Sequence, residues 1–315
     1  MKFSAVHHLL LSSFCYLNRN LRYGNSKSRL FRFLVIRIRS YLKKYIELHI
    51  DEISHFREKT IKLKYAGKLK LSPNDFIDRW LYTGADFEPH IVRLFIKILR
   101  KGDAFLDLGA NIGYFSMIAS NQIGEDGYVY SFEPNPQTLA KLKRNITLNK
   151  KRNLIVYDKA VSDQQGEIYF NIPIATIKNS GRASIRPIEE SYSSIKVQTV
   201  VLDELINEFK PLRLIKMDIE GAEALALHGM INIIERDRPF LIMELSDAYL
   251  KQLGSSADAV IAFLKKLSYT IYIAGEEIEA IDNTVALNNH QYDIFCIPQK
   301  HRQEGEDIIA SIFCD

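Results

Sequence analysis

Hydrophobic and polar positions alternate in blocks along most of the chain, and from residue 88 onward they predict strands separated by helices. Short apolar runs between polar turns predict strands at 104–109, 128–133, 153–158, 213–218, 239–245, 270–274 and 292–298. Helical spacing of apolar residues predicts helices at 88–100, from about 112, and at 136–149, 221–236 and 256–267. This alternation is typical of a mostly parallel, doubly wound α/β sheet.

Two further apolar patterns lie outside that alternation. Residues 61–71 alternate apolar and polar positions around Ala66-Gly67, which predicts a hairpin. The segments 167–172 and 195–201 also have strand-like patterns, and they enclose a polar loop. Such a loop could bind a hydroxylated acceptor or be an ordinary solvated connection, and both interpretations stay open.

The first 60 residues differ from the rest in pattern and in charge. Apolar positions recur at helical spacing on both sides of a turn at 24–26, so we expect a helical arm over 1–60 and an α/β domain over 61–315. Residues 1–50 contain ten Lys or Arg and one Glu, which leaves a net charge of −5 for the remainder of a chain with +4 overall. A basic amphipathic arm can lie on an anionic membrane, or pack on its own domain or a second subunit.

Composition narrows the class of protein. Of the 315 residues, 47% are apolar and 25% are charged, as in ordinary soluble globular proteins. Cys15, Cys296 and Cys314 show neither disulfide nor zinc spacing, so we expect a cytoplasmic protein. The most apolar early run, 6–17, is short and interrupted, so we expect no transmembrane helix and no secretory signal. The acidic main domain argues against a nucleic-acid substrate.

The most specific motif is DLGANIG, at residues 107–113, which follows an apolar strand and opens a helix. Its glycines let the backbone approach a ligand, and the helix start offers free N–H groups. Glu133 ends the next strand, where an acid can accept hydrogen bonds from a ribose diol. A dinucleotide fingerprint would need glycines in place of Asn111 and Tyr114. The pattern G-x-N-x-G after an aspartate is instead associated with S-adenosylmethionine enzymes.

A second acidic segment, KMDIEGAE, spans residues 216–223. Asp218 comes just after a central strand, where open α/β sheets place their ligands. Glu220 and Glu223 could simply cap the following helix, and we expect that role for Glu223 and a functional role for Asp218. Glu244 ends the next apolar strand, where an acid is either functional or bonded to nearby backbone.

Together these segments resemble the FkbM-type methyltransferases over roughly residues 61–298. The motifs occur in the family's order: WLYTGADFE (80–88), DLGANIGYFS (107–116), YSFEPNP (130–136), DKAVSD (158–163), IKMDIEGAE (215–223), FLIMEL (240–245) and DIFCIP (293–298). The resemblance implies a class I methyltransferase fold. In that Rossmann-like fold a mostly parallel, seven-stranded sheet has the strand order 3-2-1-4-5-7-6 and helices on both faces. It also implies O-methylation of a sugar, polysaccharide, glycolipid or secondary metabolite.

The resemblance further implies roles for individual residues. The cofactor, S-adenosyl-L-methionine, would be bound through its methionine part by Asp107, Gly109, Ala110, Asn111 and Gly113, through its ribose by Glu133, and through its adenine by Asp158 and Ala160. Asp218 and Glu220 would face the acceptor, which is a small molecule or glycan.

The expected chemistry needs no metal for activation, because a sulfonium already carries an activated methyl group. The protein must align the acceptor oxygen with the methyl carbon and sulfur, exclude water and accept the hydroxyl proton. Asp218 is our first candidate for the base, and Glu220 and Glu244 are alternatives. A magnesium or calcium ion held by these three is conceivable but not expected. An inactive binding module and a nicotinamide-dependent oxidoreductase remain as rival functions, and oligomeric state is not predicted.

Overall fold

The fold is described from a computed structural model, for residues 57–72, 75–82, 86–173, 183–186, 192–275, 277–281 and 291–312. The predicted helical arm at 1–60 lies outside these ranges except for its last four residues. Most of the polar loop between 167–172 and 195–201 also lies outside them.

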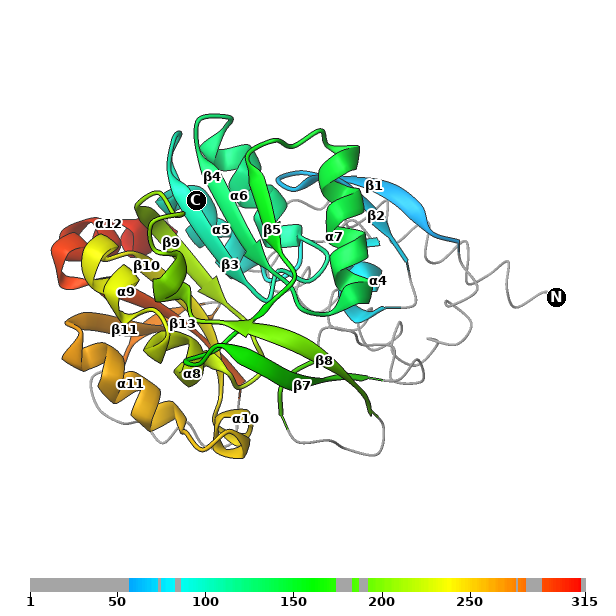
Figure 1. The fold of residues 1–315 in the computed structure, drawn as a ribbon. Helices are drawn as coiled ribbons and strands as arrows, with labels where there is room; N and C mark the ends of the chain where they lie inside the picture. The colour runs from blue at the N-terminus through cyan, green and yellow to red at the C-terminus, as the bar shows by residue number, and fades with distance from the viewer. Residues whose placement is uncertain are drawn as a thin grey trace, which may run out of the picture.

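The central element is an eight-stranded sheet (Figure 1). From edge to edge its strands are β12 (Ile278–Ala280), β11 (Tyr269–Ala274), β13 (Gln291–Pro298), β10 (Phe240–Ser246), β9 (Leu212–Met217), β3 (Ala104–Leu108), β4 (Tyr128–Phe132) and β5 (Leu154–Tyr157). Neighbours from β10 to β5 pair in parallel, whereas β13 is antiparallel to β10 and β11. We leave out the edge strand β12 and number the other seven strands in chain order. Read from β5 to β11, the order in the sheet is then 3-2-1-4-5-7-6. The predicted strand order is confirmed.

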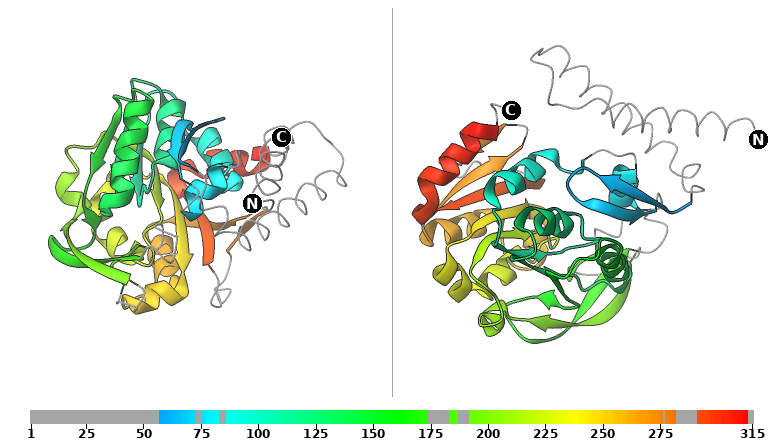
Figure 2. Two further views of the ribbon diagram at one scale, coloured as in Figure 1. Left: turned by 90° about the vertical axis from the view of Figure 1, so that its right-hand side faces the viewer. Right: turned by 90° about the horizontal axis from the view of Figure 1, so that it is seen from above.

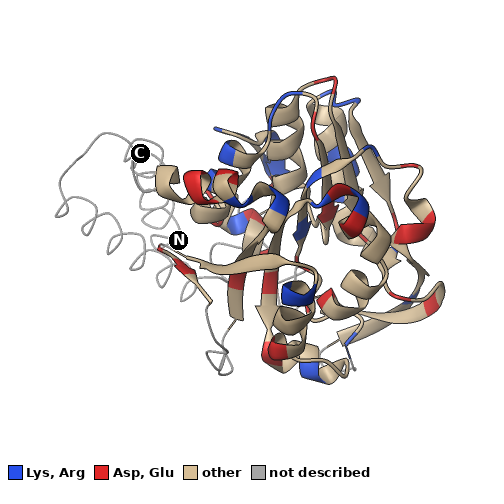
Figure 3. Cartoon of the chain, turned by 90° about the vertical axis from the view of Figure 1, so that its left-hand side faces the viewer, with Lys and Arg blue, Asp and Glu red and all other residues tan. Residues whose placement is uncertain are grey.

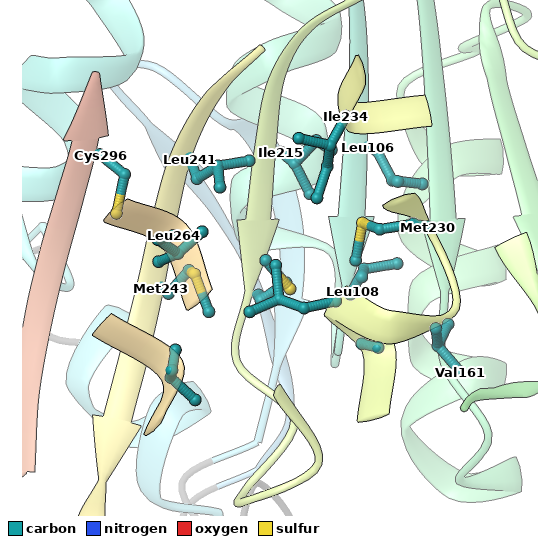
Figure 4. Packing of buried hydrophobic residues seen from close by; sticks show 14 of the residues in the cluster. Leu106, Leu108, Val161, Ile215, Met230, Ile234, Leu241, Met243, Leu264 and Cys296 are labelled. Atoms are coloured by element: carbon teal, nitrogen blue, oxygen red, sulfur yellow. The ribbon is translucent and has the colours of Figure 1, made fainter. Parts of the chain in front are cut away.

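Helices cover both faces of this sheet, as the views in Figure 2 show. One face packs on α5 (Pro89–Ile98), α6 (Tyr114–Ile123), α7 (Pro136–Leu148) and α12 (Arg302–Ile312), and the other on α8 (Glu223–His228), α9 (Ile231–Asp237) and α11 (Ala257–Lys266). Strand side chains alternate between two cores: Leu106 and Leu108 belong to one, and Phe105 to the other. Figure 4 shows the first core, where Leu106 and Met243 from strands lie with helix residues.

The predicted hairpin is confirmed as β1 (Lys59–Leu63) and β2 (Gly67–Leu71), followed by α4 (Phe76–Tyr82). The hairpin is held to α7 by buried Asn145, whose Oδ1 accepts the Lys70 N–H at 2.9 Å and whose Nδ2 donates to the Ile112 carbonyl at 3.0 Å. This attachment places α4 at the edge of the sheet where the cavity described below opens.

One predicted helix differs from the structure, and the central sheet has one strand, β12, beyond the seven expected. The helix predicted at 221–236 is wrong as a single element, because it divides into α8 and α9 around Gly229. A Cβ on Gly229 would lie 2.2 Å from the Ser162 carbonyl oxygen, so the chain is closely packed at this break. The strands predicted at 167–172 and 195–201 form as β7 (Gly166–Pro173) and β8 (Tyr192–Val200). With β6 (Ala160–Val161) they form a separate three-stranded sheet.

Several short elements were not predicted: α4, α10 (Asp247–Gln252), α12, β6, β12 and the 3-10 turns Leu202–Leu205 and Gln299–His301. Within the described ranges, no helix combines the length and the hydropathy that a membrane span requires. Acidic and basic residues are interspersed over the described part of the chain in the view of Figure 3.

Candidate active site

A cavity of about 240 Å³ lies at the carboxyl ends of β3, β4, β9 and β10. This is the edge at which open α/β sheets bind their ligands. The predicted site residues that line it are Gly109, Asn111, Glu133, Ala160, Asp218, Glu220 and Glu244. The others, Asp107, Ala110, Gly113 and Asp158, lie outside its lining.

The loop after β3 passes very close to the end of β9. Gly109 has a φ of +83°, and a Cβ there would lie 2.0 Å from the Asp218 carbonyl oxygen. The N–H groups of Gly109 and Ala110 both donate to the Phe132 carbonyl at 3.0 Å, which ties the loop to β4. Only a residue without a side chain fits this path, so the glycine is required by the backbone.

Gly113 has a different role from the one expected. It is the N-cap of α6, with a φ of +87°, and a Cβ there would lie 2.4 Å from Leu142 Cδ1 on α7. Gly113 therefore allows two helices to pack closely, and it does not line the cavity.

Glu133 stands at the end of β4 with both carboxyl oxygens held by backbone. Oε2 accepts the Asn111 N–H at 2.7 Å and Oε1 accepts the Asn135 N–H at 2.9 Å. Burial raises the pKa of Glu133 to about 7, whereas these two hydrogen bonds favour the ionised form. A carboxylate has about four acceptor positions, so it can still accept bonds from a diol.

Asp107 is buried beneath the loop and does not reach the cavity. Its Oδ2 accepts a hydrogen bond from Ser116, whose hydroxyl also lies 2.9 Å from that of Ser131. Burial raises the pKa of Asp107 to about 6, and the nearby Lys216 ammonium opposes that rise. Asp107 thus links β3 to α6 through Ser116, and Ser116 links it further to β4 through Ser131, beneath the predicted methionine-binding loop.

The side of the cavity beyond Glu133 is mostly apolar. Phe132, Ala160 and Val161 line it and are buried, and these surfaces suit the flat face of a purine. Asp158 is exposed and lies outside the lining, although Lys159 and Ala160, which follow it, line the cavity. Its predicted adenine contact has no support from this geometry.

Three carboxylates converge at the other side of the cavity. Asp218, Glu220 and Glu244 each place an oxygen within 4.8 Å of the other two. Asp218 follows β9, Glu220 lies in the next turn, and Glu244 is on β10. Burial raises the pKa of Glu244 well above its usual range, and the negative charges of Asp218 and Glu220 raise it further.

Two charged residues at this end were not singled out from the sequence, Lys216 and Glu88. Lys216 is buried, and its Nζ lies 3.0 Å from Asp218 Oδ2 and 4.8 Å from the centroid of the Phe115 ring. Glu88 lines the cavity before α5, and burial raises its pKa to about 8 against the opposing charge of Lys216. The sequence signal that could have identified Lys216 is a lysine inside the apolar run RLIKMD. For Glu88 the only signal was its position in the motif WLYTGADFE.

Glu223 has a structural role, as expected, but its side chain holds the turn before α8 and does not cap the helix, whose N-cap is Ala222. Oε1 of Glu223 accepts the N–H groups of Ile219 and Gly221, both at 3.2 Å, before the start of α8. Asp218 does not cap that helix through its side chain. Its carboxylate pairs with Lys216, and its backbone N–H donates to the Leu108 carbonyl at 3.0 Å.

Comparison with known proteins identifies the family. The model of the methyltransferase FkbM domain matches residues 107–271. The hexuronic acid methyltransferase AglP of Haloferax volcanii is 28% identical over 168 residues, which cover 53% of this chain and 65% of AglP. A protein-L-isoaspartate O-methyltransferase of Methanothrix thermoacetophila is 29% identical over 113 residues, 34% of this chain and 54% of that enzyme. The chain thus covers less than two thirds of either relative.

Solved structures are more distant. A methyltransferase FkbM from Methylobacillus flagellatus is 15% identical with a TM-score of 0.40, over 69% of this chain and 52% of that one. An S-adenosylmethionine-dependent O-methyltransferase from Thermotoga maritima is 13% identical with a TM-score of 0.38, over 76% and 77%. The fold assignment rests on the strand order, and the family assignment on the match at 107–271, which spans just over half of the chain. The chain belongs to the FkbM methyltransferase family.

Proposed function

We propose that the chain transfers a methyl group from S-adenosylmethionine to an oxygen of a sugar acceptor. The observation that carries this proposal is one cavity with two chemically different sides. The tight loop at Gly109 and the buried acid Glu133 lie on one side, and the carboxylates around Asp218 lie on the other. The hexuronic acid methyltransferase of Haloferax volcanii supports a sugar as the acceptor class.

The residues present fit the cofactor. The absence of a side chain at Gly109 brings backbone to the cavity wall, which suits the methionine part. Glu133 would accept the ribose hydroxyls, and Phe132 and Ala160 would contact the adenine. When bound, S-adenosylmethionine supplies a methyl group that is already activated by its sulfonium.

The protein's own contribution is to orient the acceptor and accept its proton. Lys216 holds Asp218 by Oδ2, and no described residue donates a hydrogen bond to Oδ1, so this oxygen would receive the acceptor hydroxyl. Lys216 is buried and Phe115 packs beneath it, so the pair has little freedom to move. Tyr249 and Gln291 line the same side and would contact the rest of the sugar.

Transfer of labelled methyl from S-adenosylmethionine to a panel of hexuronate and neutral glycans tests the proposal. We expect product with wild-type protein and turnover about 10²–10⁴-fold lower for Asp218→Asn, while cofactor affinity changes little. Asp126→Asn is the matched control, because Asp126 is exposed in the turn before β4 and lies outside the cavity lining. Unchanged turnover in folded Asp218→Asn would exclude Asp218 as the base. Binding of cofactor without transfer to any acceptor would favour the inactive binding module.

A further inference from the structure

The carboxylate side of the cavity has more negative than positive groups. Among the described residues, its acids are Glu88, Asp218, Glu220, Glu244 and Asp293, and its bases are Lys216, Arg186 and His90. Each base forms a close pair with one acid: Lys216 pairs with Asp218 at 3.0 Å, His90 with Asp293 at 2.9 Å, and Arg186 lies 3.7 Å from Glu220. This pairing leaves an excess of negative charge around Glu244.

This pairing leaves two acids without an ion-pair partner among the described residues, Glu88 and Glu244. The charge of Lys216 still acts on Glu88, whereas the charges that act most on Glu244 are negative. The Glu244 side chain is only partly exposed, and no described residue donates a hydrogen bond to it or forms an ion pair with it. The residue opposite it on β13 is another acid, Asp293. Carboxylates that have lost much of their water and lie among other negative charges are normally paired with a cation or bound to a metal, so Glu244 points to a missing positive ligand.

The spacing of the three carboxylates suits one ion. Two oxygens bound to the same ion are separated by at most twice the bond length, which is about 4.2 Å for magnesium and about 5 Å for calcium. The oxygens of Asp218, Glu220 and Glu244 lie within 4.8 Å of one another. Three oxygens this close can surround a calcium-sized ion after a small inward shift of the side chains, and magnesium would need a larger one.

We propose that Asp218, Glu220 and Glu244 bind a divalent cation with oxygen ligands. Lys216 stays paired with Asp218 through Oδ2, and Asp218 Oδ1 contacts the ion with one lone pair and keeps the other for the acceptor hydroxyl. The ion neutralises the excess charge around Glu244 and leaves coordination positions open toward the cavity. An acceptor with two adjacent oxygens, such as a sugar diol or a uronate, fills those positions. This last step rests on the proposed function, whereas binding of the ion itself does not.

Calorimetric titration of metal-free, full-length protein with CaCl₂, MgCl₂ and MnCl₂ tests the site. We expect one ion per chain with a dissociation constant no weaker than about 10⁻³ M. Glu244→Gln should weaken binding at least tenfold, because it removes a charged ligand and keeps the shape. The matched control is Glu235→Gln, which changes an exposed acid on α9 and should leave binding unaltered.

Glu220→Gln serves as a second ligand variant should Glu244→Gln fail to fold, and circular dichroism checks both. Absence of saturable binding by wild-type protein at about 10⁻² M of each ion overturns the inference. Binding that both ligand variants retain at full affinity also overturns it. Titration of the same preparation with S-adenosylmethionine keeps the two proposals apart: a protein that binds the cofactor but no ion contradicts only the metal site.

Discussion

Gly109→Ala tests whether the close contact between the loop after β3 and the end of β9 matters beyond the ordinary strain of a positive φ. An alanine Cβ would lie 2.0 Å from the Asp218 carbonyl oxygen, whereas ordinary contact begins near 3.4 Å, so one strand end would have to retreat by more than an ångström. The Asp218 N–H is bonded to the Leu108 carbonyl at 3.0 Å, and this bond resists the movement.

The expected cost has two parts. A non-glycine residue at a φ of +83° costs about 1–2 kcal/mol, and overpacking against backbone costs about 1–3 kcal/mol more. We therefore expect Gly109→Ala to lower the free energy of unfolding by about 2–5 kcal/mol, and to weaken S-adenosylmethionine binding at least tenfold, because the loop and Asp218 both line the cavity.

Gly102→Ala is the matched control. Gly102 has a similar φ of +85°, but a Cβ there would meet nothing within 4 Å. The free energy of unfolding of Gly102→Ala should fall only by the cost of the positive φ, and this variant should bind S-adenosylmethionine normally. Urea denaturation measures the first quantity and calorimetry the second. The reasoning fails if Gly109→Ala is no less stable than Gly102→Ala and binds S-adenosylmethionine equally well.

Three further predictions concern other parts of the chain. Glu133→Gln should weaken S-adenosylmethionine binding about ten- to hundred-fold. In wild type, ribose hydroxyls favour ionised Glu133, so affinity should fall as the pH drops below about 7, by up to tenfold per pH unit, and calorimetry of Glu133→Gln should show no such dependence. Asn145→Ala should lower the free energy of unfolding by about 2–4 kcal/mol by leaving buried backbone groups unpaired, whereas Thr147→Ala on the same helix should change it by less than about 0.5 kcal/mol; equal losses would contradict the hairpin attachment. If the basic arm at 1–50 contacts anionic membrane, deleting it should abolish salt-sensitive sedimentation with anionic vesicles, and equal sedimentation without it ends that hypothesis.

Local pattern was sufficient for the main strands because each buried strand is a short apolar run between polar turns. The strand order came from the family resemblance, and the pairing in the sheet confirms it. The break at Gly229 was not predictable from helical spacing, because the contact that requires it is with Ser162, far away along the chain.

Site residues were harder to predict than elements, because a motif does not say which side chains face the cavity. Asp107 and Glu133 both belong to strand ends, yet Asp107 points down to Ser116 while Glu133 lines the cavity. Gly113 has the conformation expected of a loop glycine, but the space it leaves is filled by Leu142. Glu88 reaches the site only through the packing of α5 against the sheet, which no local pattern describes.

The central claim is that the cavity between the Gly109 loop, Glu133 and Asp218 binds S-adenosylmethionine. Calorimetric titration of the wild-type protein with S-adenosylmethionine, its demethylated product and NAD tests it most directly. We predict one binding site for each of the first two ligands and no saturable heat with NAD. Folded protein that binds NAD, but neither S-adenosylmethionine nor its product, would contradict the account.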